Sequence, residues 1–218
     1  MSCPDCAKGG LHEGTPEGRE EVLHGFQTYV TRPSPGTQIK GEIVYLPDAL
    51  GWKFNNSRIL FYGKFATPRV TQFLTSIRAA QSEPLPIGAA GFCWGGKFVF
   101  LLCGETLKFN GRPLIDFGFT AHPSNLVLPL DAENVRLPIS VAVGDIDVMV
   151  PIKKAEEMKS ILEGKGGNEV VIIPGAAHGF ATRAKPEDEK GTQKGVQAED
   201  QAVNWFNRCF DGYKKPAT

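Results

Sequence analysis

The sequence predicts an α/β fold in which a mostly parallel sheet is covered by helices on both faces. Three observations lead to this prediction. Short apolar stretches alternate with longer segments whose apolar residues recur at helical spacing. The length of 218 residues, with 41% hydrophobic and 22% charged residues, fits one ordinary globular domain. No internal repeat, heptad pattern or domain-scale linker divides the chain, so we expect residues 1–218 to form a single domain.

The first third of the chain should supply two strands. Residues 1–22 are polar and are expected to form an irregular N-terminal arm. Residues 24–31 read as a first strand because apolar and polar side chains alternate there, and a Pro/Gly turn follows. Residues 41–46 read as a second strand, which leads into the loop at 47–52.

The middle of the chain should supply a helix, a strand and a buried helix. Thr67 is a good N-cap and Pro68 a good first residue for a helix that ends before Pro84. The apolar residues that share one face of this helix are Val70, Phe73, Leu74, Ile77 and Ala80. Residues 87–91 form a short strand of small residues, and residues 97–103 are so apolar that their helix should be buried.

The remaining elements continue the alternation. Residues 114–120, 138–143 and 169–173 read as strands. A helix opens at Pro151 and closes at Gly164. The final helix carries one apolar stripe, made of Ala198, Ala202, Val203, Phe206 and Phe210.

Charge and cysteine content narrow the possible partners. The 24 basic and 24 acidic residues cancel, so nothing suggests a nucleic-acid partner, which usually requires a basic surface. No apolar run approaches the roughly 18–20 residues of a membrane span, and the N-terminus does not resemble a signal peptide. We therefore expect a cytoplasmic protein without a membrane partner, whose five cysteines are mostly reduced thiols.

Three chemically competent residues each follow a predicted strand. They are Cys93, Asp147 and His178. The carboxyl ends of parallel strands meet at one edge of the sheet, which is where open α/β sheets bind ligands. The order nucleophile, acid, histidine is the order in which α/β-hydrolases carry their triads. We therefore predict a catalytic triad in which His178 is the base and Asp147 orients it.

The segment around Cys93 matches the nucleophile elbow, Gly-x-nucleophile-x-Gly, with cysteine in the place of serine. Its glycines allow a sharp strand-to-helix turn, and the following helix N-terminus favours the reactive thiolate. The backbone N–H of Trp94 is the expected first oxyanion donor. A second N–H is expected from Ala49 or Leu50, in the loop after the second strand.

Some assignments remain open from the sequence alone. Asp145 competes with Asp147 for the role of the acid. Either side chain is also a candidate to cap the helix that opens at Pro151, which would be a structural role. Cys3 and Cys6 form a lone Cys-x-x-Cys, which is a weak signal for a redox pair or for a zinc site completed by histidines. We predict neither a metal nor a cofactor.

The motifs resemble the dienelactone hydrolase family. The matching segments are Gly-Phe-Cys-Trp-Gly-Gly at the elbow, Gly-Asp-Ile-Asp at the acid and His-Gly-Phe at the histidine, and Ser-Cys-Pro-Asp-Cys with Ala-His-Pro-Ser is similar to the fungal branch. The resemblance implies an α/β-hydrolase fold. It also implies metal-free hydrolysis of a lactone or small activated ester through an acyl-thioester. The sequence leaves open whether the chain acts as a monomer or a homodimer.

The same resemblance suggests two further site residues. In bacterial members an acid after the second strand pairs with the resting thiol, and Asp48 lies at the matching place. An arginine after the catalytic histidine holds a substrate carboxylate in those members, and Arg183 follows His178 at nearly that spacing.

The chain departs from the family pattern in one region. Family members have a further strand, with a helix before it and a long covering loop after it, between the oxyanion loop and the elbow strand. Only residues 51–86 are available here, so the fold should be shortened at this point. An alternative function follows, in which the chain is a non-catalytic binding or scaffold protein with an incomplete pocket.

Overall fold

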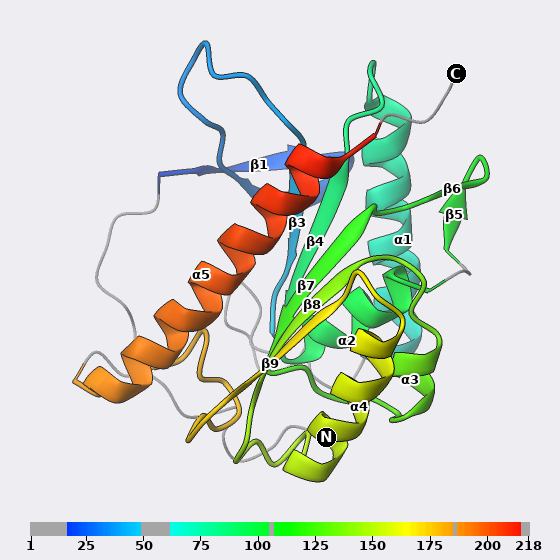
Figure 1. Ribbon diagram of the computed structural model, residues 1–218. Coiled ribbons are helices and arrows are strands. Elements are labelled where there is room, and N and C mark those ends of the chain that lie inside the picture. The colour runs from blue at the N-terminus through cyan, green and yellow to red at the C-terminus, as the bar shows by residue number, and fades with distance from the viewer. Residues whose placement is uncertain (1–16, 49–61, 105–106, 185–186, 215–218) are drawn as a thin grey trace.

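A five-stranded parallel sheet forms the centre of the computed structural model, which describes residues 17–48, 62–104, 107–184 and 187–214 (Figure 1). Its spatial order is β3-β4-β7-β8-β9, and each neighbouring pair is parallel. The strands are β3 (Glu42–Leu46), β4 (Ile87–Phe92), β7 (Phe117–Ala121), β8 (Ile139–Gly144) and β9 (Glu169–Ile173). The predicted α/β fold with a mostly parallel sheet is confirmed.

The helices lie on both faces of the sheet, but unequally. The helices on one face are α1 (Tyr62–Ala80), α2 (Trp94–Leu102), α3 (Leu130–Glu133) and α4 (Ile152–Gly164). The long helix α5 (Glu189–Gly212) crosses the other face, against β7 and β8 (Figure 1). The strands follow one another in space as they do in sequence, so right-handed crossovers place every connecting helix on the same side.

Two apolar cores result from this arrangement. On the face of the connecting helices, Leu74 of α1, Val99 of α2 and Met158 of α4 are fully buried against the sheet. On the other face, Phe119 of β7 packs against Phe206 of α5. Both cores therefore rest on strands whose two sides are apolar, as in other parallel sheets covered twice.

The N-terminal region differs from its prediction. Strands β1 (Arg19–Leu23) and β2 (Phe26–Val30) pair as an antiparallel hairpin that forms a separate sheet. The expectation that residues 1–22 are irregular is therefore wrong for β1, and the expected strand 24–31 begins two residues late. His24 and Gly25 both have positive φ, 52° and 80°, as a two-residue hairpin turn requires. β1 escaped prediction because Arg-Glu-Glu-Val-Leu is largely charged.

Other boundaries shift for local reasons. α1 begins at Tyr62 and contains Pro68, so Thr67 is not its N-cap. The small hairpin formed by β5 (Lys108–Phe109) and β6 (Arg112–Pro113) was not expected, and nor was the four-residue α3. Elements this short bury too little to leave an apolar pattern.

β3 is the end strand of the five-stranded sheet, and β4 is its hydrogen-bonded neighbour. Along the described chain no strand occurs between β3 and β4, while residues 49–61 lie outside the described part. Two apolar side chains of β3, Ile43 and Tyr45, are half exposed.

Of the helices in the described ranges, none is long and apolar enough to cross a membrane.

Candidate active site

The turn between β4 and α2 holds Cys93 in a strained conformation. Its backbone has φ 52° and ψ −113°, and the residue is 1% exposed. Positive φ is costly for a residue with a side chain, so its presence here is a feature of a functional turn. A Cβ on Gly91 would collide with the carbonyl of Gly95, and a Cβ on Gly95 would collide with the carbonyl of Leu46. Both elbow glycines are therefore required by close backbone contacts.

The structure brings Cys93, His178 and Asp147 into one hydrogen-bonded chain. His178 Nε2 lies 3.1 Å from Cys93 Sγ, and His178 Nδ1 lies 3.0 Å from each carboxylate oxygen of Asp147. All three residues are buried. They follow β4, β9 and β8 respectively, so the shared carboxyl edge of the sheet joins residues that are far apart in sequence.

Asp145 and Asp147 make different contacts. Asp147 faces His178 and also accepts a hydrogen bond from the Met149 backbone N–H at 2.8 Å. Asp145 accepts one from the Gly175 N–H at 2.6 Å. Pro151, the residue before α4, has no side-chain cap, so neither aspartate caps that helix. Asp145 instead ties the loop after β8 to the loop that carries His178.

The electrostatics of the site favour a thiolate and an imidazolium. Burial by itself would raise the pKa of the Cys93 thiol, but the hydrogen bond and charge of His178, with smaller effects of Ser124 and Arg183, lower it to about 7. Burial by itself would lower the pKa of His178, but its hydrogen bonds to Asp147 and Cys93 raise it to about 9. Charged partners that hydrogen-bond directly therefore outweigh desolvation.

Two buried residues in the loop after β7 also reach the site. The sequence favours a structural role for His122 over a pocket role, and it assigns no role to Ser124. The Ser124 hydroxyl lies 3.6 Å from Cys93 Sγ. The His122 ring packs edge-on against the His178 ring, with centroids 5.1 Å apart. Burial, together with the charges of His178 and Arg183, holds the pKa of His122 well below its usual value. Their only signal was the position of Ala-His-Pro-Ser directly after a strand.

Arg183 and Asp48 approach the site and pair with each other. Arg183 Nη1 lies 3.2 Å from Asp48 Oδ2, and both side chains are nearly buried. The Arg183 charge also contributes to lowering the pKa of Cys93. Asp48 thus has a cation beside it, and its pairing with the resting thiol stays a prediction.

The predicted oxyanion donors are only partly within the described structure. Trp94 is the first residue of α2, so its backbone N–H lies in the first turn of that helix, directly after Cys93. Ala49 and Leu50 lie outside the described residues. Cys3, Cys6 and the nearby His12 also lie outside them. Among the described residues no cluster of three or more His, Cys, Asp or Glu is arranged to hold a metal ion.

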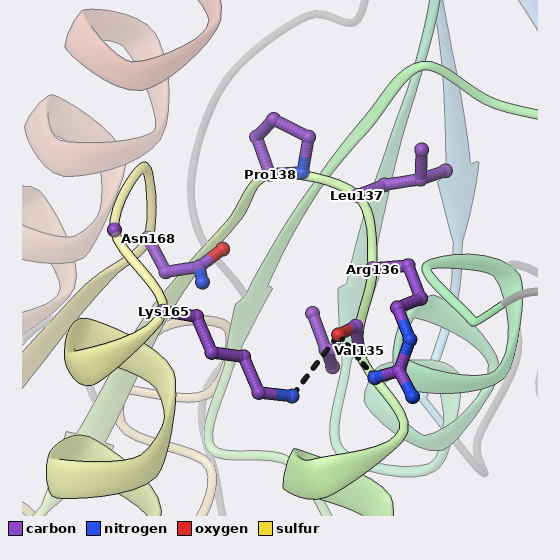
Figure 2. Close-up of a pocket in the computed structure, with 7 residues that line it drawn as sticks. Val135, Arg136, Leu137, Pro138, Lys165 and Asn168 are labelled. Atoms are coloured by element: carbon purple, nitrogen blue, oxygen red, sulfur yellow. Dashed lines mark hydrogen bonds between the residues drawn. The ribbon is translucent and has the colours of Figure 1, made fainter.

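A separate hollow of about 390 Å³ lies at the opposite edge of the sheet, before the starts of β8 and β9 (Figure 2). Lys165 donates to the carbonyls of Ala132, Glu133 and Val135 at 2.7–3.0 Å, and Arg136 donates to that of Glu133 at 2.6 Å. These cations cap the last carbonyls of α3, which is a structural role.

Curated relatives match along almost the whole chain. Hydrolase pyvD of Aspergillus violaceofuscus is 24% identical over 241 residues, covering 93% of this chain and 95% of its own length. Dienlactone hydrolase 1 of Gibberella moniliformis is 21% identical and covers 84% of each chain. The pyvD alignment spans 241 positions, more than the 218 residues of this chain, so at some aligned positions the relative has residues where this chain has none.

Solved structures share the fold. A putative dienelactone hydrolase from Klebsiella pneumoniae has a TM-score of 0.59 at 15% identity, covering 90% of this chain and 98% of its own. Native esterase 2 of Thermogutta terrifontis has a TM-score of 0.63 at 16% identity, covering 92% and 94%. The sequence model of the dienelactone hydrolase family matches residues 60–210, from before the elbow to the last helix. The chain therefore belongs to the dienelactone hydrolase family.

Proposed function

We propose that this member of the family hydrolyses a lactone or small activated ester with Cys93 as the nucleophile, through an acyl-thioester. One observation carries the proposal. The Cys93 sulfur, the two nitrogens of His178 and the Asp147 carboxylate form a continuous chain of contacts of 3.0–3.1 Å. This is the geometry of a nucleophile, its base and the group that orients the base.

The proposed reaction begins from the thiolate and imidazolium. The Cys93 sulfur attacks the substrate carbonyl, and the developing oxyanion accepts hydrogen bonds from the Trp94 N–H and from the loop after β3. His178 then gives its Nε2 proton to the departing alkoxide, which in a lactone remains attached to the acyl chain. A water molecule that gives its proton to His178 attacks the thioester. Collapse of the second tetrahedral intermediate releases the carboxylic acid and restores Cys93.

Arg183 supports a preference for substrates that carry a carboxylate. Its guanidinium lies beside Asp48 and influences the Cys93 sulfur electrostatically, so it is placed to attract an anionic group near the nucleophile. A substrate carboxylate would compete with Asp48 for Arg183. We accordingly expect Arg183→Met to raise KM for a carboxylate-bearing lactone more than for a neutral p-nitrophenyl ester.

The test is hydrolysis of a dienelactone and a short p-nitrophenyl ester by the wild type and by Cys93→Ala. We expect turnover by the wild type and none above background by the variant. Cys209→Ala is the matched control, because it removes a different thiol, on α5, and should keep full activity. Equal turnover by wild type and Cys93→Ala would refute the proposed nucleophile.

A second candidate is a binding or scaffold protein with an incomplete pocket. The position of β3 at the end of the sheet and the extra length of the pyvD alignment favour it. It predicts a folded wild type that reacts with a thiol-alkylating reagent but forms no acyl-enzyme and turns over no ester. A cytoplasmic location and the absence of nucleic-acid or membrane partners remain predictions.

A further inference from the structure

A buried hydroxyl, that of Ser124, lies beside the candidate nucleophile. Ser124 is 3% exposed, and its Oγ lies 3.6 Å from Cys93 Sγ, a distance within the range of hydrogen bonds to sulfur. We propose that Ser124 is a further catalytic residue, whose hydroxyl donates a hydrogen bond to the Cys93 thiolate and keeps the sulfur ionised beside His178. This inference rests on the proposed cysteine chemistry.

The backbone around Ser124 is fixed from both sides. The Ser124 N–H donates to the Cys93 carbonyl at 2.9 Å, so the serine is tied to the nucleophile itself. The His122 N–H donates to the Ala142 carbonyl at 2.8 Å. His122 and Asn125 both have positive φ, 39° and 57°. Unfavourable conformations held on either side of a residue indicate that the surrounding structure determines its position.

The third glycine of the Gly-Phe-Cys-Trp-Gly-Gly motif, Gly96, is explained by the packing of this loop. Gly91 and Gly95 are explained by the elbow, but Gly96 is not part of the Gly-x-nucleophile-x-Gly pattern. A Cβ on Gly96 would collide with the Thr120 hydroxyl and would lie 2.8 Å from the Cβ of Pro123. The missing side chain thus allows the His-Pro-Ser loop to pack closely on the start of α2, which is what brings the hydroxyl to the sulfur.

The hydroxyl suits the protonation states of the proposed reaction. When Cys93 is a thiol, its S–H can donate to His178 Nε2 or to Ser124 Oγ. When the proton has moved to His178, the Ser124 O–H turns and donates to the negative sulfur, so the thiolate has two donors in place of one. When the sulfur is acylated, its charge is gone and this hydrogen bond weakens. The interaction therefore favours the ionised resting state and the departure of the thiolate from the acyl-enzyme.

The charged neighbours must be considered together, since each also acts on the sulfur. The titratable and charged groups around it are His178 and Arg183 and, through them, Asp147, Asp48 and His122. Ser124 differs from all of them because it is neutral at every pH used. Removal of the Ser124 hydroxyl takes one hydrogen bond from the Cys93 thiolate and leaves the charges around it unchanged. A difference in Cys93 reactivity between the wild type and the variant therefore reports on that hydrogen bond.

The test measures the thiolate directly. The rate of Cys93 alkylation by iodoacetamide is followed against pH for the wild type, Ser124→Ala and Ser124→Gly. We expect both variants to raise the midpoint of the profile by roughly half to one pH unit, as loss of one hydrogen bond predicts, and Ser124→Thr to restore it. Ser76→Ala, which removes a hydroxyl on α1, is the matched control and should leave the midpoint unchanged.

Turnover supplies a second readout. For a neutral p-nitrophenyl ester, Ser124→Ala should lower kcat several-fold with little change in KM, because the hydroxyl contacts the sulfur and not the ester. Midpoints equal to the wild type in folded Ser124→Ala or Ser124→Gly, judged by an unchanged thermal transition, would overturn the inference and leave the cysteine mechanism intact. A wild-type thiol that titrates like free cysteine would contradict both.

Discussion

Replacement of Asp147 by asparagine tests the coupling between the acid and the base most directly. The change keeps the size of the side chain but removes the negative charge of the carboxylate, whose two oxygens each lie 3.0 Å from His178 Nδ1. At an effective dielectric constant of about 20, two charges about 4 Å apart interact by about 4 kcal/mol. An asparagine oxygen that still accepts the Nδ1 hydrogen bond recovers part of this energy. A net loss of about 3–4 kcal/mol corresponds to a roughly 200- to 1000-fold lower kcat/KM.

The assay is steady-state hydrolysis of a short p-nitrophenyl ester at pH 8, between the pKa of Cys93, about 7, and that of His178, about 9. Asp145→Asn is the matched control, because it removes a carboxylate from the same loop whose partner is the Gly175 N–H. We expect the control to lose less than about tenfold. An Asp147→Asn enzyme with near wild-type activity, or a control that loses more, would refute this assignment of the acid.

Three further predictions concern the thiol and the stability of the fold. Alkylation of Cys93 requires the thiolate, so its rate should fall as pH drops through about 7, and His178→Asn should move this midpoint upward, as measured by iodoacetamide labelling. Arg78→Met removes the buried cation that pairs with the half-buried Asp116 carboxylate at 2.5 Å and leaves it with Arg112 at 3.6 Å and the Ile87 N–H, so the change should cost about 1–3 kcal/mol in urea unfolding; no measurable loss would contradict this. Leu74→Ala, at a fully buried position, should cost about 2–5 kcal/mol in the same measurement, and a near-zero change would show that α1 is not packed as described.

The alternation of strands and helices was predictable because the sheet is buried on both faces. β9 has its predicted bounds, and β3, β4 and β8 differ by one residue at most at either end, since each is an apolar run bounded by Gly, Pro or a charge. The meeting of Cys93, Asp147 and His178 also followed from sequence, because each lies within a few residues of the carboxyl end of a parallel strand. Spacing alone did not predict it; the common edge of the sheet did.

The contributions of the loop after β7 could not be predicted in the same way. Ser124 reaches the sulfur because of positive φ at residues on either side of it and a hydrogen bond to the Cys93 carbonyl, and neither leaves a pattern in the sequence. The hairpin of β1 and β2 was missed for a related reason. Charged residues on β1 gave no apolar alternation, while the turn at His24 and Gly25 depends on backbone conformation.

The placement of α5 has a consequence for how the molecule is assembled during synthesis. The sheet grows in one direction as the chain emerges, since each strand adds beside the one made before it, and the connecting helices cover one side as they form. The second side, with Phe117 and Phe119 on β7, is covered by the helix made last, Glu189–Gly212 (Figure 1). A nascent chain stopped before Glu189 carries that aromatic surface uncovered, so premature termination at that point yields a product prone to self-association and suited to chaperone capture.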